Sequence, residues 1–465
     1  MLTTNVLPLP RILLGALLLA GATSSQATLL VVTVKTDSYD GQCNLHCSLR
    51  DAMAVANQSA DADIILLPSG TYTLTRRNLR DDDNQPIDED DNLIGDLDVA
   101  GEVLIQGAGI GKSIIEGVKP DPFFVREHRL FEVRPGARLI LKSLSLKRGS
   151  SANNGGAVEN HGNLLLHDVQ ARGNLTSIRD FGGADSGRGG AIANYGDLLV
   201  SASSFVGNSA VEDLGDPLGG AIFNSGNLQV RGSHFESNDV GGLSLSGAGT
   251  AIYNTASARI ETSSFIGNVI GELAEGGAIT NEGGVLTVTN STFSHNFESA
   301  ITNGRNDNPP AIRSSATLTN VTIVDGKSEN SNRYGVMNWG QLLIRNSLIA
   351  GNSSWPGDVV LNCQNFGDHY SYQAIGLLRN DESSNCSADL FVPFEQTFTQ
   401  VLSPTLTSDG KTSFHALLPD SPAIDAGIGD CIAKDQRGVT RPKDGNGDGV
   451  AVCDLGAYEA DSLMQ

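Results

Sequence analysis

The residues best suited to chemistry lie near the end of the chain, in the run DGNGDG that begins at Asp444. Asp444, Asn446 and Asp448 place a side-chain oxygen at every second position, and a glycine follows each of them, as in loops that wrap a calcium ion. The twelfth position of such a loop is Leu455, which has no ligating atom, but Asp454 comes one residue earlier. The run therefore predicts a calcium site formed by Asp444, Asn446, Asp448 and Asp454, with a polar turn as the alternative. We expect no other cofactor.

The same part of the chain gathers ionisable residues that invite a catalytic interpretation: His415, Asp420, Asp425, Asp435, Arg437 and Glu459. The structural interpretation is that Asp425 and Arg437 form an ion pair that fastens this part of the chain. A second acidic run, Asp81–Asp98, is a candidate cation site, with a solvated loop as the alternative.

A polysaccharide enzyme is the alternative to a binding or structural protein. A lyase needs an Arg or Lys base near the sugar C5 proton together with cations, and a hydrolase needs two carboxylates about 5–10 Å apart. The middle of the chain contains scattered basic residues in no motif typical of a lyase: Arg172, Arg188, Arg231 and Arg259. We therefore assign no catalytic residue from the sequence.

The elements that must position these side chains follow from a repeated phrase, GGAI-x-N. It reads GGAVEN, GGAIAN, GGAIFN and GGAITN from Gly155, Gly189, Gly219 and Gly276, with a degenerate GTAIYN from Gly249. Most copies continue to a second phrase, F-x-x-N, which begins at Phe205, Phe235, Phe265 and Phe293. A module that returns every 27 to 34 residues is typical of a solenoid, in which each coil stacks on its neighbours to bury its apolar face.

Three short strands and three turns alternate within each module. This pattern predicts an all-β fold, a right-handed parallel β-helix of the pectin-lyase-like type. The glycine pair should lie where successive backbones approach closely, and the phenylalanines should stack in the core. We expect one asparagine of each GGAI-x-N to form a hydrogen-bonded ladder rather than a row of sugar-binding amides: Asn194, Asn224, Asn254 and Asn281.

The first 27 residues have the features of a signal peptide. Arg11 precedes a short apolar run, and the small residues Ser25 and Ala27 suit a signal-peptidase site, so cleavage is expected after Ala27. No later stretch is long and apolar enough to span a bilayer. The net charge of −22 argues against nucleic acid and anionic membranes as partners. These features predict an exported monomer that is secreted or at the cell surface.

Two caps are expected to flank the repeats, which we place at residues 64–352. In the N-terminal cap, residues 28–63, the segment Cys47–Asn57 predicts a short helix with Ser48 as its N-cap. Residues 353–465 form the C-terminal cap. Six cysteines in an exported chain favour disulfides, and pairing by sequence proximity predicts Cys43–Cys47, Cys363–Cys386 and Cys431–Cys453.

Three parts of the chain resemble bacterial exported proteins. CSLRDAMAVAN, at Cys47–Asn57, resembles the CSLREA motif. HALLPDSPAIDAG, DQRGVTRP and CDLGAYE resemble the choice-of-anchor Q module, and the repeats resemble those of chlamydial polymorphic outer membrane proteins. The resemblance covers nearly all of the chain after the signal peptide. It implies a β-helix at or beyond the cell surface and supplies no shared catalytic residues.

These observations favour a binding function. Every strongly repeated residue has a structural role in a strand, turn, ladder or stack, and the segments between repeats vary, as in Ser177–Arg188 and Ala210–Leu218. A fixed coil with variable loops is how a solenoid presents a binding surface. We therefore expect an exported, non-catalytic protein that acts by adhesion or by binding extracellular glycan or protein. A polysaccharide lyase or glycoside hydrolase is the alternative.

Overall fold

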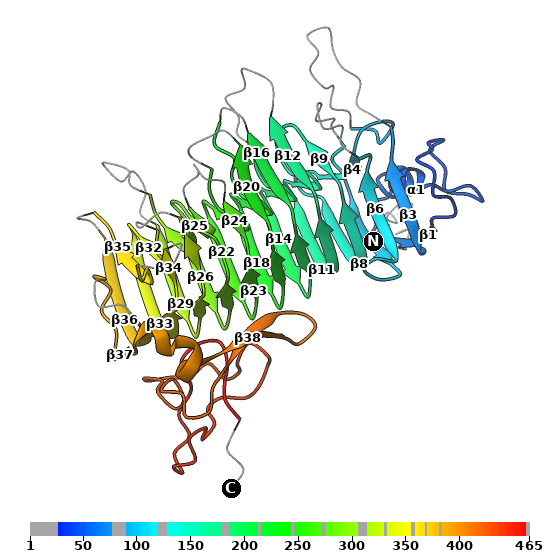
Figure 1. The fold of residues 1–465 in the computed structure, drawn as a ribbon. Coiled ribbons are helices and arrows are strands. Elements are labelled where there is room, and N and C mark those ends of the chain that lie inside the picture. The colour runs from blue at the N-terminus through cyan, green and yellow to red at the C-terminus, as the bar shows by residue number, and fades with distance from the viewer. Residues whose placement is uncertain are drawn as a thin grey trace, which may run out of the picture.

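The structure is a computed structural model that describes residues 27–76, 90–119, 128–178, 187–212, 215–242, 247–270, 276–305, 314–329, 333–354, 359–367, 370–380 and 384–461. Within these residues the chain forms a right-handed parallel β-helix, as the repeats predict, with α1 (Leu49–Ala56) as its one α-helix. Figure 1 shows the coils stacked side by side along a single axis, with the N-terminal coils in blue and the last coils in yellow.

Ten parallel strands form one face, which we call the asparagine sheet because most of its strands end in asparagine. They are β4 (Leu97–Val99), β7 (Phe131–Val133), β10 (Val158–Asn160), β13 (Ile192–Asn194), β17 (Ile222–Asn224), β21 (Ile252–Asn254), β25 (Gly277–Asn281), β28 (Ser299–Asn303), β32 (Val336–Asn338) and β35 (Cys363–Asn365).

The second face, the broad sheet, contains 20 strands. They are β1 (Leu29–Val31), β2 (Asp63–Leu67), β3 (Gly70–Leu74), β5 (Glu102–Gly107), β6 (Ser113–Gly117), β8 (Arg138–Lys147), β11 (Asn163–Arg172), β14 (Asp197–Ser201), β15 (Ser204–Val206), β18 (Asn227–Arg231), β19 (His234–Glu236), β22 (Ser257–Glu261), β23 (Ser264–Ile266), β26 (Val285–Thr289), β27 (Thr292–Ser294), β29 (Ser315–Thr319), β30 (Thr322–Val324), β33 (Gln341–Ala350), β36 (Ser371–Arg379) and β37 (Leu390–Phe391). Parallel pairing from β1 to β37 carries the β-helix beyond the predicted limits of 64 and 352.

A third, narrow sheet of five strands closes the coil: β9 (Ser150–Ser151), β12 (Leu175–Ile178), β16 (Ser209–Glu212), β20 (Asp239–Gly242) and β24 (Val269–Ile270). Two later coils continue this side with the pair β31 (Lys327–Ser328) and β34 (Ser353–Ser354).

The middle coils hold four strand segments rather than the three predicted, because the broad sheet bends. β11 pairs with both β14 and β15 and bends at Asp168, which has a φ of 55°. In the following coils the strand breaks at the equivalent positions Ala202 (φ 46°), Gly232 (φ 53°) and Thr262 (φ 49°). A single left-handed residue turns the chain direction without a loop, so each coil gains a corner.

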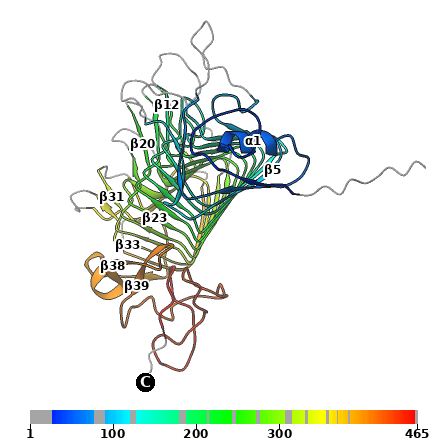
Figure 2. The same cartoon turned by 90° about the vertical axis from the view of Figure 1, so that its right-hand side faces the viewer.

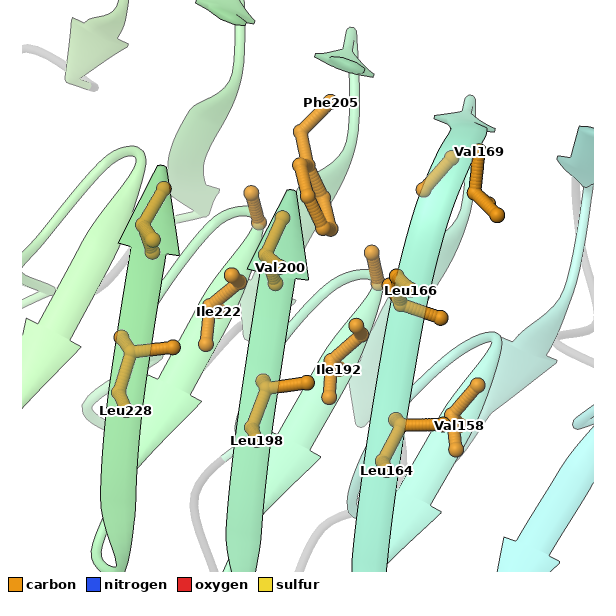
Figure 3. Packing of buried hydrophobic residues seen from close by; sticks show 14 of the residues in the cluster. Val158, Leu164, Leu166, Val169, Ile192, Leu198, Val200, Phe205, Ile222 and Leu228 are labelled. Carbon is orange, nitrogen blue, oxygen red and sulfur yellow. The ribbon is translucent and has the colours of Figure 1, made fainter. Parts of the chain in front are cut away.

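The core is a set of aligned aliphatic columns with an aromatic stack at one corner. Figure 3 shows Ile192 and Ile222 of the asparagine sheet facing Leu198 and Leu228 of the broad sheet across the interior. The rings of Phe205, Phe235, Phe265 and Phe293 stack at centroid distances of 4.8, 4.7 and 4.6 Å. Since adjacent parallel strands lie about 4.8 Å apart, identical rings in register must stack, and the predicted core stack is confirmed.

The predicted asparagine ladder is also confirmed. The Nδ2 of Asn194 donates to Oδ1 of Asn224 at 2.7 Å, and that of Asn224 donates to Asn254 at 2.7 Å. The ladder runs from Asn160 to Asn365. A second ladder joins the asparagines of F-x-x-N in the same way: Asn208, Asn238, Asn268 and Asn296. Both ladders satisfy amides that the core would otherwise bury without a partner.

The repeated glycine pair lies where two coils touch. Gly219 has a φ of +75°, which glycine adopts without steric cost. A Cβ on Gly220 would lie 2.2 Å from the carbonyl oxygen of Thr250 in the next coil. The pair is therefore required by backbone contact, as predicted.

Helix α1 covers the N-terminal end of the β-helix (Figure 2). Ser48 caps it, as predicted, and its hydroxyl and the Asp51 carboxylate form a capping box. Leu49 and Met53 lie in the main core. The buried guanidinium of Arg50 lies 2.7 Å from Oδ1 of Asp37 and donates to four backbone carbonyls of residues 92–96. The motif CSLRD thus supplies a cap, a core face and a cross-link in one turn of helix.

The last part of the chain, residues 394–461, forms a tail module of η1 (Phe394–Gln396), η2 (Thr397–Val401), β38 (Leu402–Ser408), β39 (Ser413–Leu417) and irregular turns. Figure 1 shows it in orange and red along the side of the coils. Its contacts reach β23, β27, β30 and β33 on the outer face of the broad sheet. The predicted C-terminal cap therefore lies on the flank of the last coils. All three predicted disulfides are present.

Candidate functional site

The outer face of the asparagine sheet carries side chains that differ from coil to coil. The residue before the last of each strand follows a residue of the core, and these residues lie in register from strand to strand. In order along the axis these residues are Asp98, Glu132, Glu159, Ala193, Phe223, Tyr253, Thr280, Thr302, Met337 and Gln364.

A second row, which we call the corner row, follows the end of each of these strands. Its backbone amides bond coil to coil, as from Tyr195 N to Asn160 O and from Trp339 N to Asn303 O. The row reads Arg134, His161, Tyr195, Ser225, Thr255, Glu282, Gly304, Trp339 and Phe366. The two rows together form the candidate site.

Charged groups converge at the N-terminal end of this face. Arg129 lies 2.6 Å from Asp96 and 2.7 Å from Glu132, and also bonds Glu159. Burial alone would lower the pKa of Arg129, but Asp96, Glu159 and Glu132 together raise it. The guanidinium therefore stays charged and neutralises carboxylates from three coils.

Arg134 makes a similar link at the edge of the face. It forms ion pairs with Asp90 and Asp98. Of the acidic run Asp81–Asp98, the residues up to 89 lie outside the described part of the chain. In the described part of this run, Asp90, Asp96 and Asp98 form ion pairs with arginines.

Stacked rings follow in the middle coils. The ring of His161 stacks on Tyr195 with centroids 4.9 Å apart, Tyr195 contacts Phe223 at 5.8 Å, and Phe223 stacks on Tyr253 at 5.9 Å. The guanidinium of Arg188 lies over the Phe223 ring at 5.2 Å. Phe223 and Tyr253 are buried, whereas Tyr195 is partly exposed and His161 more so.

Tyr253 ends this run with a polar contact. Its hydroxyl donates to Oε2 of Glu282 at 2.6 Å. Burial and the neighbouring Glu282 carboxylate raise the pKa of Tyr253, so it remains a neutral donor. Glu282 in turn lies 3.9 Å from Arg305.

A second ring cluster lies at the C-terminal end of the same face. Trp339 stacks on Phe366 with centroids 4.5 Å apart, and Tyr334 meets Phe366 edge-on at 6.0 Å. All three side chains are partly exposed. The preceding position of the corner row is Gly304, where a Cβ would lie 3.0 Å from the Trp339 Cβ. The corner row therefore offers no side chain of its own against that side of Trp339.

The predicted calcium residues form a turn whose oxygens are occupied by backbone amides. Asp444 accepts from Gly447 N at 2.8 Å, and its other oxygen accepts from Gly449 N at 2.9 Å. Asp454 is buried and accepts from Asp425 N and Ala460 N instead of facing the loop. Across the described residues, no three His, Cys, Asp or Glu side chains are grouped so as to hold a metal ion.

Asn446 and Asp448 complete that turn in the same manner. Oδ1 of Asn446 accepts from Asp448 N, and Oδ1 of Asp448 accepts from Val450 N. These contacts are those of the polar-turn alternative.

The predicted ion pair between Asp425 and Arg437 is wrong. Arg437 lies 2.7 Å from Asp435, two residues before it, and donates to the carbonyl of Glu459. Asp425 accepts from the backbone of Gly445 and Asn446. The spacing in DQR, with opposite charges two residues apart, was the available signal for the observed pair.

The remaining tail residues are not gathered at one point. Asp420 lies in a turn with a φ of 60°. Glu459 pairs with Arg441 inside the tail module, whereas His415 lies at the surface that meets the broad sheet.

The four scattered arginines likewise do not gather at one site. Arg231 and Arg259 share Glu261 on the broad sheet, Arg172 is exposed, and only Arg188 lies beside the candidate site. The variable segments Ser177–Arg188 and Ala210–Leu218 fall partly outside the described residues.

Comparisons with known proteins concern the fold. A pectate lyase, Pel9A, aligns over 94% of this chain and 97% of its own at 16% identity, with a TM-score of 0.48. The A-module of the mannuronan C-5 epimerase AlgE6 from Azotobacter vinelandii aligns over 72% of this chain and 95% of its own at 12% identity, with a TM-score of 0.30.

The alginate lyase AlyGC aligns over 84% of this chain and 55% of its own at 11% identity, with a TM-score of 0.33. Identities this low speak to the fold alone. No family model and no curated protein matches the chain, so the resemblance to CSLREA and choice-of-anchor Q proteins stays a prediction. The helices of the described residues include none with the length and apolar character needed to cross a membrane.

Proposed function

We propose that this protein is exported and binds an extracellular glycan, without turnover, along the outer face of the asparagine sheet. The observation that carries the proposal is the corner row. It places partly exposed rings at both ends of a polar stretch, His161 and Tyr195 at one end and Trp339 and Phe366 at the other.

The stretch between the two ring clusters suits a chain of polar units. Ser225, Thr255, Glu282 and Gly304 separate Tyr195 from Trp339, so the two rings lie five coils apart, or roughly 24 Å at about 4.8 Å per coil. Aromatic faces accept the apolar side of a sugar ring, while hydroxyl and carboxylate groups between them accept and donate hydrogen bonds. Adhesion to a glycan-coated surface is the expected consequence.

Binding is favoured over turnover because the charged groups of this face are engaged with one another. Arg129 contacts Asp96, Glu132 and Glu159 at once, and Glu159 also lies 3.1 Å from His161. A lyase needs a basic group directed at the substrate, and a hydrolase needs an acid and a base directed at one glycosidic bond. A polysaccharide lyase or hydrolase is the alternative that the experiment addresses.

Three disulfides support export, because such bonds persist in oxidising compartments. The expected signal peptide, residues 1–27, lies almost entirely outside the described residues. Calcium, if it binds the DGNGDG turn, would act away from the asparagine sheet, on the tail module.

The test is a glycan array probed with the mature protein, with and without calcium, followed by calorimetry on the strongest ligand. Tyr195→Ala and Trp339→Ala should each weaken binding by about tenfold or more, as for other aromatic anchors. His167→Ala is the matched control, since His167 is an exposed ring on the broad sheet that bonds only Ser201.

Two results contradict the proposal. Equal affinities for Trp339→Ala and His167→Ala would show that the corner row does not bind the glycan. Sustained release of reducing or unsaturated ends from the bound glycan would show turnover.

A further inference from the structure

A continuous chain of polar side chains joins the β-helix to the tail module. Oδ2 of Asp325 lies 3.0 Å from Nε2 of His295, whose Nδ1 lies 2.6 Å from Oγ of Ser294. Oγ of Ser294 also lies 2.9 Å from Nε2 of His415, and Nδ1 of His415 lies 2.8 Å from the carbonyl oxygen of Ser403. Ser294, His295 and Asp325 belong to the coils, and His415 and Ser403 belong to the tail module.

These hydrogen bonds cannot all form while both histidines are neutral. The chain of side chains has four contacts, and both ends, the Asp325 carboxylate and the Ser403 carbonyl, can only accept. A neutral His295, a neutral His415 and the Ser294 hydroxyl supply one hydrogen each, which makes three. A fourth hydrogen is required, so the docked arrangement holds one added proton.

The environment places that proton on His295. Its hydrogen bond to Asp325 raises the pKa of His295, against burial and the nearby Lys327 charge, which lower it. Burial lowers the pKa of His415, which is 1% exposed. His295 then donates to Asp325 and to Ser294, Ser294 donates to His415, and neutral His415 donates to Ser403.

The groups that face these histidines are few. Lys327 lies 3.3 Å from Oδ1 of Asp325 and competes with His295 for that carboxylate. The Phe398 ring of η2 packs against His415 at 5.9 Å, and the two histidine rings lie 6.3 Å apart. Asp325 is thus the anion that holds the added proton in place.

The order Ser, His, Asp does not make this a hydrolytic site. Ser294 is 0% exposed beneath the tail module, so its hydroxyl cannot reach a substrate while the module is docked. Its hydrogen bonds to His295 and His415 join the β-helix to the tail module.

We propose that docking of the tail module on the β-helix takes up one proton at Asp325, His295, Ser294 and His415, so that the contact loosens as the pH rises. A group whose pKa is raised in the docked state stabilises that state below its ordinary pKa. The stabilisation is lost as the pH rises through the docked value, that is, from just below to above the usual range of histidine.

Hydrogen exchange of the full chain tests the proposal. The contribution of this contact to the protection of the β38 and β39 amides should fall as the pH rises from about 6.5, the ordinary pKa of histidine, to about 8.5, by at most about tenfold per pH unit, the limit for one linked proton. Ser294→Ala interrupts this series of hydrogen bonds and should remove the part of the pH dependence that the docking contact contributes. His167→Gln, which alters an exposed histidine–serine pair 2.9 Å apart on the broad sheet, should leave it unchanged.

A titration of the wild-type histidine resonances by NMR keeps the test independent of any variant's folding. One histidine, assigned as His295 by its loss in His295→Gln, should titrate above its ordinary pKa, and His415 should titrate below its ordinary pKa. Ordinary titration of both histidines would overturn the proposal. So would an equal pH dependence of β38–β39 protection in wild type and Ser294→Ala.

Discussion

Glu459 and Asp454 are carboxylates held in the interior of the tail module. Burial raises the pKa of Glu459 to about 7 and that of Asp454 to about 6, against the pull of their backbone donors and Arg441. Glu459 accepts from Lys443 N at 2.8 Å and from Asp454 N at 3.0 Å, and lies 3.2 Å from Arg441. These contacts orient the carboxylate, while the lost hydration disfavours its charge.

The tail module should therefore lose stability as the pH rises. A carboxyl whose folded pKa is raised stabilises the fold below its unfolded value, and this contribution disappears as the pH passes the folded value. We expect the free energy of unfolding of the tail module to fall by about 1–3 kcal/mol from pH 5 to pH 8, at about 1.4 kcal/mol per pKa unit. The measurement is the melting temperature across this range.

Two variants isolate the effect. Glu459→Gln should flatten the pH profile, and Asp461→Asn, at an exposed ion pair with Lys443, should not. Ser294→Ala should retain the part of the profile that Glu459→Gln removes, because Ser294 belongs to the docking contact and Glu459 pairs with Arg441 inside the tail module. A profile unchanged by Glu459→Gln would assign the pH dependence to other groups.

At the scale of the element, the stability of each coil depends on its hydrogen bonds to the coils before and after it. Asn224 is 0% exposed, accepts from Asn194 and donates to Asn254, Gly226 and Ser257. Asn224→Ala removes these four hydrogen bonds, although the Asn194 amide still donates to Gly196 O and the Asn254 carbonyl still accepts from Ala256 N. Since each hydrogen bond contributes about 0.5–1.5 kcal/mol, we expect a loss of about 2–4 kcal/mol.

Hydrogen exchange resolves where that loss falls. Protection should decrease first in β13, β17 and β21, because solenoid coils are stabilised chiefly by their neighbours. Ser225→Ala, one residue on and exposed, is the control and should change stability by less than about 0.5 kcal/mol. A loss spread evenly over the whole β-helix would contradict this local picture.

The DGNGDG turn is a second element whose behaviour follows from its contacts. Asp444→Ala removes the acceptor for the amides of Gly447, Asp448 and Gly449. We expect a fall in melting temperature of about 2–4 °C, corresponding to about 1 kcal/mol, that is the same in calcium and in chelator. Asp448→Ala, which removes an acceptor only for Val450 N, should cost less. A loss seen only with calcium present would make this turn a metal site.

At the scale of the whole molecule, features tied to the repeat are predictable from the sequence. The Phe205–Phe293 stack and the asparagine ladder follow because equivalent residues meet once a coil closes. The capping box at Ser48 and the three disulfides follow from local spacing. Each of these features depends on residues that are close in sequence or that occupy equivalent positions in successive repeats.

The bend of the broad sheet and the candidate site depend on residues that are near one another neither in sequence nor in the repeat. The bend of the broad sheet falls on Ala202, Gly232 and Thr262, which share no residue type that signals a turn. Arg129 and Glu159 are 30 residues apart and meet only because the intervening coil has a particular length. Contacts of this kind require the register of every coil, which the repeated phrase alone does not provide.

The flank position of the tail module has the same origin and a further consequence. Val324, Leu348 and Leu378 point out of the coils and are at most 1% exposed, because Val401, Leu402 and Leu455 of the tail module cover them. Apolar patches of this kind drive association when uncovered. The tail module therefore keeps this apolar patch of the coils away from water.

A chain that ends at Val392 should keep the circular dichroism of the β-helix and yet self-associate. Its coils retain every parallel strand from β1 to β37, but the patch around Leu348 meets water. We expect sedimentation to show oligomers at concentrations where the full chain is monomeric, and added dye-binding typical of exposed apolar surface. The same truncation carrying Leu348→Gln and Leu378→Gln should return to a monomer, because it removes the patch and leaves the inward columns intact. If the truncated chain stays monomeric without these changes, the tail module is not needed as a cover. If the truncated chain gives no β-sheet signal, the tail module is required for the β-helix to fold.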